Sequence, residues 1–313
     1  MITVTTLKGK PPNVPCAVAL GYFDGLHIGH RAVIRKAKSY QAKGLNTCVF
    51  SFSTTTANPE SGKGNQNLIT LPMKERLLRR MGVDYIYVPD FTEFKDLEPE
   101  QFVKRVLQQK LCARVVCCGV SFRFGKGARG DVKLLEGLCN EYGITLHVVP
   151  DVLVDGETVS TTRIRTLLEE GETVLTAKLL GRPFSYDYPV IAGRHIGRTL
   201  DFPTINQQFS EGMFLPRKGV YASYVTLGSK RLPGVTNIGV RPTIEGGLQP
   251  NSETYIIGYT GDLYGKRVEV HLIKYLREEQ RFETLQALKD AIASDTAAVQ
   301  QNFDRWLKEV RQK

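Results

Sequence analysis

The first half of the chain alternates short apolar runs with longer amphipathic segments. The apolar run at 16–20 predicts a buried strand, and the segment 30–42 gathers its apolar residues on one helical face. Gly44 is expected to end this helix, and a second apolar run covers 47–52. A strand, a helix and a strand in this order are typical of a parallel α/β sheet.

The same alternation continues to about residue 182. Two of the expected helices, 72–81 and 99–111, have proline at their first position, where its missing N–H does no harm. The remaining elements of this half are helices at 131–142, 161–170 and 173–180 and strands at 84–88, 115–118 and 144–150.

From residue 183 the pattern changes to short β-like runs separated by glycine and proline turns. Close spacing with no helices between the runs predicts an antiparallel barrel. Residues 283–313 return to helical periodicity. We therefore expect an α/β domain at 1–182 and a barrel domain with a C-terminal helix at 183–313, whose strands are 190–192, 220–227, 234–238, 254–259 and 268–273.

Composition narrows the function classes. A net charge of +10 over 313 residues suits anionic ligands, either nucleotides or nucleic acid, and does not choose between them. The six cysteines form no CxxC pair and several lie in apolar runs, which argues for reduced thiols and against a zinc site. We expect no signal peptide, no membrane span and a cytoplasmic location.

Residues 21–30, GYFDGLHIGH, lie between the first expected strand and the first expected helix. This arrangement directs backbone N–H groups and a helix N-terminus at a phosphate. His27 and His30 share a face of the first turn and can donate to phosphate oxygens as charge builds up on them. The alternative is a turn with two satisfied histidines. Two of the chain's five histidines lie here with Asp24, which favours the phosphate site.

Two more segments suit nucleotide or flavin chemistry. Residues 119–130, GVSFRFGKGARG, follow an expected strand and combine basic residues for anions with Phe122 and Phe124 for a ring to stack on. Residues 160–165, STTRIR, bring three hydroxyls and two arginines to the start of a helix, as in a phosphate cradle. The alternatives are a basic connector and an ordinary Ser/Thr cap.

In the second half, residues 192–199, AGRHIGRT, nearly match a Walker A loop but carry Arg198 in place of lysine. Pro203 follows within one turn, so the segment is not a P-loop, although its glycines can still present N–H groups to phosphates. Thr204 and Asn206 are two apart, so on a strand both can reach one Mg²⁺ ion, or they simply face water. Glu253 is the best-placed carboxylate for a catalytic base.

Together these motifs resemble known families. Residues 21–30, 119–131 and 159–165 resemble FAD synthetases, a branch of the HxGH nucleotidyltransferases. Class I aminoacyl-tRNA synthetases share the HIGH tetrapeptide, but this sequence has no KMSKS-like segment downstream of it. Five later stretches and the SET at 252–254 resemble bacterial riboflavin kinase: GRTLDFPTIN (197–206), PRKGVYASYV (216–225), GVTNIGVRPT (234–243), DLYG (262–265) and YLREEQRF (275–282).

In this order the motifs resemble bifunctional bacterial riboflavin kinase/FAD synthetases. The resemblance implies a Rossmann-like nucleotidyltransferase domain followed by a mainly antiparallel β-barrel riboflavin kinase domain. It further implies that riboflavin and MgATP give FMN in the barrel, and that FMN and a second ATP give FAD and pyrophosphate in the first domain. The expected partners are these small molecules and Mg²⁺, with no nucleic acid and no membrane; the oligomeric state stays open.

The resemblance also implies roles for individual residues. The catalytic residues would be His27, His30, Arg165 and Glu253. Nucleotide and phosphate would be bound by Gly21, Phe23, Asp24, Gly29, Ser160, Thr161, Thr162, Gly193, Gly197, Arg198 and Thr199. Flavin would be bound by Phe122, Phe124, Asn237, Arg241 and Arg277, and the metal ion by Thr204 and Asn206.

Three positions depart from the family pattern. The segment 51–59 lacks the usual His-Pro, Ser121 replaces an acid or amide, and Asp201 replaces a glycine. Two alternatives to a bifunctional enzyme stay open. One is a riboflavin kinase with a weak or inactive adenylyltransferase domain. The other is a basic RNA-binding regulator, which would bind RNA in a salt-sensitive way that ATP does not displace.

Overall fold

The computed structural model describes residues 2–4, 7, 14–53, 66–193, 200–242 and 248–311. The chain forms two compact units, Met1–Asn65 with Leu71–Ser160 and Gln66–Thr70 with Thr161–Lys313. Helices α5 (Thr161–Glu170) and α6 (Thr173–Leu180) group with the second unit. The predicted domain boundary after residue 182 stays a prediction.

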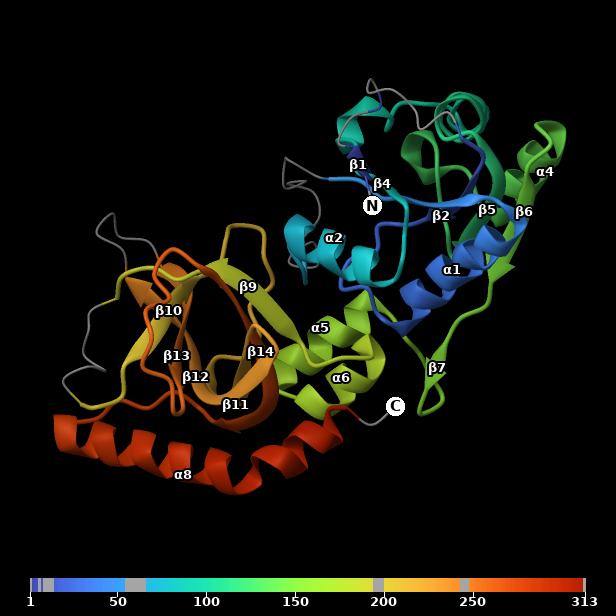
Figure 1. Cartoon of the computed structure of the whole chain (residues 1–313). Coiled ribbons are helices and arrows are strands. Elements are labelled where there is room, and N and C mark those ends of the chain that lie inside the picture. Colours follow the sequence, from blue (N-terminus) through green and yellow to red (C-terminus); the bar gives the residue numbers. More distant parts are fainter. Residues whose placement is uncertain are drawn as a thin grey trace. The chain divides into compact units, whose positions relative to one another are not determined.

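The first unit is built on a parallel six-stranded sheet in the order β1-β4-β3-β2-β5-β6 (Figure 1). This confirms the predicted α/β class. The short β1 and a two-stranded hairpin were not predicted from the sequence. The sheet strands are β1 (Ile2–Val4), β2 (Cys16–Leu20), β3 (Asn46–Phe50), β4 (Tyr85–Tyr87), β5 (Ala113–Gly119) and β6 (Thr145–Val149), and the hairpin strands are β7 (Leu153–Val154) and β8 (Glu157–Thr158).

Helices cover this sheet. Helix α1 (Ile28–Lys38) contacts β2, β3, β5 and β6, and the 3₁₀ turn after it ends at Gly44, whose φ of 79° confirms the predicted stop. Alternate residues of β2, among them Val18 and Leu20, belong to a hydrophobic core cluster that also contains Val103 and Leu107. The other helical segments are α2 (Leu71–Arg80), α3 (Pro99–Gln101), a π-helix (Phe102–Lys110), α4 (Val132–Glu141) and 3₁₀ turns at Phe91–Glu93 and Lys126–Ala128.

The second unit is a nearly closed antiparallel barrel of six strands in the order β10-β13-β12-β11-β14-β9, as predicted (Figure 1). The strand predicted at 190–192 begins earlier than expected: β9 covers Ser185–Pro189, and Val190 and Ile191 follow it with single bridges to Tyr264 and Asn206. The buried Ser185 and Asp187 hide this strand from a search for apolar runs. The strands are β9 (Ser185–Pro189), β10 (Thr204–Gln208), β11 (Gly219–Leu227), β12 (Lys230–Pro242), β13 (Leu248–Ile256) and β14 (Arg267–Arg277).

Helix α8 (Leu285–Glu309) runs along the barrel and contacts β11, β12 and β14 (Figure 1). Thr284 caps it by accepting a hydrogen bond from the backbone N–H of Ala287. Val299 and Trp306 pack into the core beside the barrel, whereas the first turns of the helix line a cavity described below. Among the described residues, none of the helices combines the length and apolar character needed to cross a membrane.

Candidate active sites

The first candidate site is the turn between β2 and α1. His27 caps α1, because its Nδ1 accepts a hydrogen bond from the backbone N–H of His30 at 3.2 Å. A neutral His27 ring therefore carries its proton on Nε2, which becomes a donor. The two imidazole rings stack with centroids 3.5 Å apart. Burial, followed by the charges of His27 and Lys74, lowers the pKa of His30 well below its usual value, so this ring is neutral near pH 7.

The backbone of this turn is unusual. Phe23, Gly25 and Leu26 have φ values of 53°, 70° and 47°, in the left-handed region that favours glycine. A Cβ on Gly29 would lie 3.2 Å from the His27 ring, so the close packing of that ring requires glycine. The structure thus brings the predicted residues together with both histidines in one turn: Gly21, Phe23, Asp24 and Gly29.

The hydroxyl segment begins at the end of the first unit. A Cβ on Gly29 would lie 3.8 Å from the carbonyl oxygen of Val159, so the residue preceding Ser160 reaches the start of α1. Arg165, in the second unit, donates from Nε and Nη2 to the carbonyl oxygen of Gln66 at 3.1 and 2.8 Å. The predicted placement of Thr161, Thr162 and Arg165 against the histidine turn stays a prediction.

A cavity of about 530 Å³ opens beside the same turn in the first unit. Phe122 and Phe124, predicted as flavin contacts, line it with their rings 9° from parallel, and Gly21 lines it too. The other phenylalanines of the lining were not predicted as flavin contacts. Phe91 and Phe94 could have been found, because they are three residues apart and precede a helix that starts with proline. The aromatic lining consists of Phe50, Phe52, Phe91, Phe94, Phe102, Phe122 and Phe124.

The second candidate site is a row of side chains across the barrel. Asn206 on β10 pairs with Glu253 on β13, which pairs with Asn237 on β12. Asn237 pairs with Val220 on β11, and Val220 pairs with Arg277 on β14. Residues paired directly across a sheet point to the same side. Five strands therefore align four of the predicted kinase residues in one line.

Three of these four side chains, Glu253, Asn237 and Arg277, line a second cavity of about 530 Å³, between the barrel and the start of α8. The polar side chains of its lining include Thr204, Glu253, Asn237 and Arg277, and also Glu279, Gln280, Glu283, Thr284 and Asp295. Apolar side chains line it as well, and among them Phe202 packs edge-on against Tyr255, with the ring centroids 5.1 Å apart. The remaining apolar lining comes from Leu200, Val220, Val235, Phe282, Leu285, Leu288 and Ile292. The cavity thus offers both polar and apolar side chains to a ligand.

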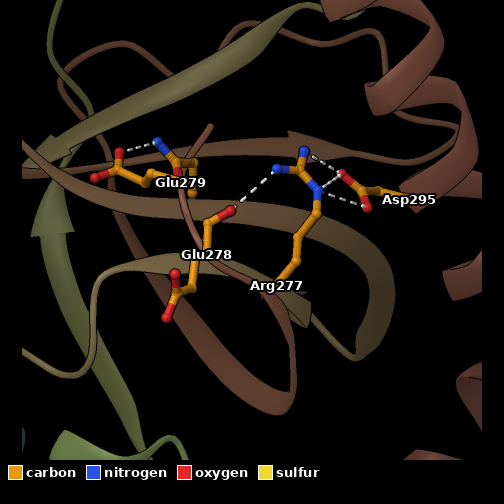
Figure 2. Close-up of polar contacts among 5 residues, drawn as sticks. Arg277, Glu278, Glu279 and Asp295 are labelled. Atoms are coloured by element: carbon orange, nitrogen blue, oxygen red, sulfur yellow. Dashed lines mark hydrogen bonds and ion pairs between the residues drawn. The ribbon is translucent and has the colours of Figure 1, made fainter. Parts of the chain in front are cut away.

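Two carboxylates that were not predicted from the sequence, Asp295 and Glu279, hydrogen-bond to polar side chains of this cavity (Figure 2). Asp295 of α8 accepts from Nη2 of Arg277 at 2.8 Å, while Nη1 of Arg277 donates to the carbonyl oxygen of Glu278 at 3.2 Å. Asn237 donates from Nδ2 to Glu279 at 2.9 Å, and its Oδ1 is buried with no partner among the described residues. Asp295 was detectable, because it interrupts the apolar face that Ile292 and Val299 continue.

The predicted metal position can be tested by its donor set. Among the described residues, no three His, Cys, Asp or Glu side chains gather as a metal cage. Thr204 and Asn206 offer hard oxygen donors beside Glu253, and a Cβ on Gly193 would overlap the Asn206 amide, so glycine leaves room there. These donors fit a Mg²⁺ ion that takes its other ligands from phosphates and water. Gly197, Arg198, Thr199 and the Arg241 side chain lie outside the described residues.

The histidine turn at the carboxyl end of a parallel strand and the polar row of the barrel define a nucleotidyltransferase-type unit followed by a phosphotransferase-type barrel. Residues 10–163 match the family model of FAD synthetase, and residues 180–303 match that of riboflavin kinase. The chain belongs to the bifunctional riboflavin kinase/FMN adenylyltransferase family.

Curated relatives of that name support the assignment along nearly the whole chain. The protein from Escherichia coli (strain K12) is 36% identical over 298 residues, which cover 94% of this chain and 95% of the relative. The one from Bacillus subtilis (strain 168) is 31% identical, covering 91% and 92%. A solved structure described as a macrolide-efflux protein from Streptococcus pneumoniae has a TM-score of 0.84 at 26% identity, covering 96% of this chain and 98% of that one.

Proposed function

We propose that this chain converts riboflavin to FMN in the barrel and FMN to FAD in the α/β unit, using ATP in both reactions. One observation carries the proposal: each compact unit holds its own cavity of about 530 Å³, the first lined by phenylalanines beside Gly21 of the histidine turn, the second by Glu253, Asn237 and Arg277 together with apolar side chains. Each cavity can thus hold a flavin ring against apolar side chains close to the polar groups of its own unit.

In the kinase reaction, Glu253 accepts the proton of the ribityl 5′-hydroxyl as that oxygen attacks the γ-phosphorus of ATP and ADP leaves. The row places Glu253 between Asn206 and Asn237, so the base lies among groups that bind polar substrate atoms. Arg277 lines the same cavity, with its positive charge paired to Asp295. Thr204 and Asn206 would hold Mg²⁺, which neutralises phosphate charge when bound.

In the second reaction, a phosphate oxygen of FMN attacks the α-phosphorus of ATP and pyrophosphate leaves. Nε2–H of His27 and the neutral ring of His30 donate to phosphate oxygens as charge develops, and the N-terminus of α1 adds its N–H groups. Ser160, Thr161, Thr162 and Arg165 are assigned to phosphate binding on the family resemblance alone. The flavin ring stacks against Phe122 and Phe124.

Two further points belong to the proposal. The small-molecule substrates are the only partners we assign, with no nucleic acid and no membrane. We place both reactions in the cytoplasm, in keeping with six free cysteines, five of them buried.

The proposal is tested by chromatography of flavins after incubation with MgATP. Riboflavin should give FMN first and FAD later, FMN alone should give FAD and pyrophosphate, and removal of divalent cations with EDTA should stop both. The formed histidine turn and aromatic cavity favour this outcome over a kinase with a silent first domain. FMN that accumulates without any FAD would establish that alternative instead.

A further inference from the structure

Helix α2 carries a lysine that neither proposed reaction uses. The side chain of Lys74 is buried, with the residue only 6% exposed, and lysine is almost never buried without partners. Its ammonium group donates to the carbonyl oxygen of Tyr22 at 2.8 Å and to Oγ of Ser51 at 3.1 Å. It also lies 4.8 Å from the centroid of the Tyr22 ring. All of these partners adjoin the histidine turn or the end of β3.

The Tyr22 carbonyl receives a second donor, because the hydroxyl of Ser51 donates to it at 2.7 Å. The next residue after this carbonyl, which accepts two hydrogen bonds, is Phe23. Phe23 is the first residue of the turn with a left-handed backbone conformation. A non-glycine residue keeps such a backbone only where its surroundings fix it. Lys74, Ser51 and Tyr22 thus form a buried clamp at the point where the chain enters the turn that ends in His27.

We propose that Lys74 is a positioning residue for adenylyl transfer, whose ammonium group holds the Tyr22 carbonyl and thereby fixes the direction in which His27 and His30 point. This inference rests on the proposed function of the turn. Lys74 itself does not contact the substrate; it acts through the backbone. A displacement of about 1 Å in a catalytic group is enough to lower a rate about 10²-fold.

Replacement by alanine with amine rescue tests the clamp. Lys74→Ala should lower kcat for FAD formation about 10²-fold, while KM for FMN changes less than about threefold because the aromatic cavity is untouched. Ethylammonium, which can donate into the vacated space, should restore kcat at least about tenfold. Tetramethylammonium, which has no N–H, should not. A lysine that only fills the core would not distinguish these two cations.

The controls lie in the same chain. Riboflavin phosphorylation should be unchanged in Lys74→Ala, and Lys104→Ala, which alters an exposed lysine of the same unit, should leave both reactions unchanged. The inference is overturned by a folded Lys74→Ala protein whose kcat for FAD formation stays within about threefold of wild type, or by equal rescue with both cations. A wild-type protein that makes no FAD would refute the proposed function itself, which is a separate outcome.

If Lys74→Ala unfolds the first unit, Lys74→Met decides. It keeps an unbranched side chain in the core and removes every N–H that can donate to Tyr22, so kcat for FAD formation should fall about 10²-fold while KM changes less than about threefold. A folded Lys74→Met protein with unchanged kcat overturns the inference.

A pH profile gives a second readout. Burial lowers the pKa of Lys74 to about 8, with the charge of Asp24 opposing this shift, so the ammonium form is lost as pH rises through that value. Three titratable side chains of the turn face Lys74: Asp24, His30 and Tyr22, whose ring centroid lies 4.8 Å from the ammonium. His30 stays neutral here because its pKa is lowered well below its usual value. Ser51, at the end of β3, brings no charge. Wild-type kcat for FAD formation should therefore fall above pH 8, and this step should be missing in the rescued alanine variant. The same step in both proteins counts against the inference.

Discussion

The two candidate active sites are built in opposite ways. In the first unit, the chemistry is concentrated in one continuous turn, where strained backbone and a helix N-terminus direct two histidines. In the barrel, Asn206, Glu253, Asn237 and Arg277 are far apart in sequence and meet only through the register of five strands. The site in the turn depends on local backbone conformation. The site in the barrel depends on how the strands of the whole sheet are paired.

The difference has a consequence for substitutions. A change in the barrel row removes one side chain from a rigid sheet and leaves the neighbouring strands in place, so its effect should stay with the chemistry of that side chain. A change in the turn can also alter the backbone that positions its neighbours.

The largest effect is expected from Glu253→Gln, which keeps the shape of the side chain but cannot accept a proton. Loss of a general base lowers rates by roughly 10²–10⁴-fold, so FMN formation should fall by that factor. FAD formation from added FMN should be unchanged. Glu279→Gln, which alters a cavity carboxylate bonded to Asn237, is the matched control and should lower the kinase rate by less than about tenfold. Equal losses in the two variants would remove Glu253 from its role.

His30→Ala tests the local site. Removing one donor to developing charge lowers rates by on the order of 10²–10³-fold, so FAD formation should fall by that much while FMN formation continues. His147→Ala, which alters a histidine of β6 that contacts Tyr40, should leave FAD formation within about threefold. Loss of both reactions in a folded His30→Ala protein would show that the two sites are not separate.

How far the sequence predicted these sites follows from the same contrast. The turn was predictable, because its signals are local: the glycines, the two histidines three apart, and the helix that ends at Gly44. The class of the second unit was predictable as well, since closely spaced β-like runs leave few folds. Glu253 was selected by its place at the start of an expected strand and by the family resemblance, and its alignment with Asn206 and Asn237 could not be predicted, since register depends on distant pairings.

The residues missed by the sequence analysis share one property. Lys74, Asp295 and Ser51 are polar residues that act on other protein groups, so none of them belongs to a motif with its own chemistry. Lys74 and Asp295 each lie on a helical face that is otherwise apolar, which is a detectable signal but does not identify the partner. The strand β9 was misplaced for a related reason, since its buried polar residues break the apolar pattern.

Asp295→Asn tests the support of the barrel row. Arg277 and Asp295 are 23% and 12% exposed, so removing the carboxylate charge leaves a largely buried guanidinium unpaired. The free energy of unfolding of the second unit should fall by about 1–3 kcal/mol, below the value for a fully buried pair because water still reaches the arginine. KM for riboflavin should rise, with kcat less affected. Asp290→Asn, on the same helix and hydrogen-bonded to the exposed Gln286, should change stability by less than about 0.5 kcal/mol.

The smallest effect is expected at Asp201, where the family usually has glycine. Its φ of 67° is left-handed, which explains why glycine is preferred, and its carboxylate pairs with Lys289 of α8 at 2.7 Å. Two opposing terms meet here: backbone strain of about 1 kcal/mol and an ion pair worth about 0–1 kcal/mol, since the Asp201 side chain is 81% exposed.

Salt separates the two terms. At low ionic strength the strain and the ion pair nearly cancel, so Asp201→Gly should change the free energy of unfolding by less than about 1 kcal/mol. At about 1 M salt the pair is screened and only strain is left, so the glycine variant should become more stable than wild type. Lys289→Ala, which removes the pair and keeps the strain, should be less stable than wild type at low salt and equal to it at high salt. Denaturant unfolding at both ionic strengths measures these differences. A glycine variant that is less stable than wild type at high salt would show that Asp201 stabilises the protein by more than its ion pair with Lys289.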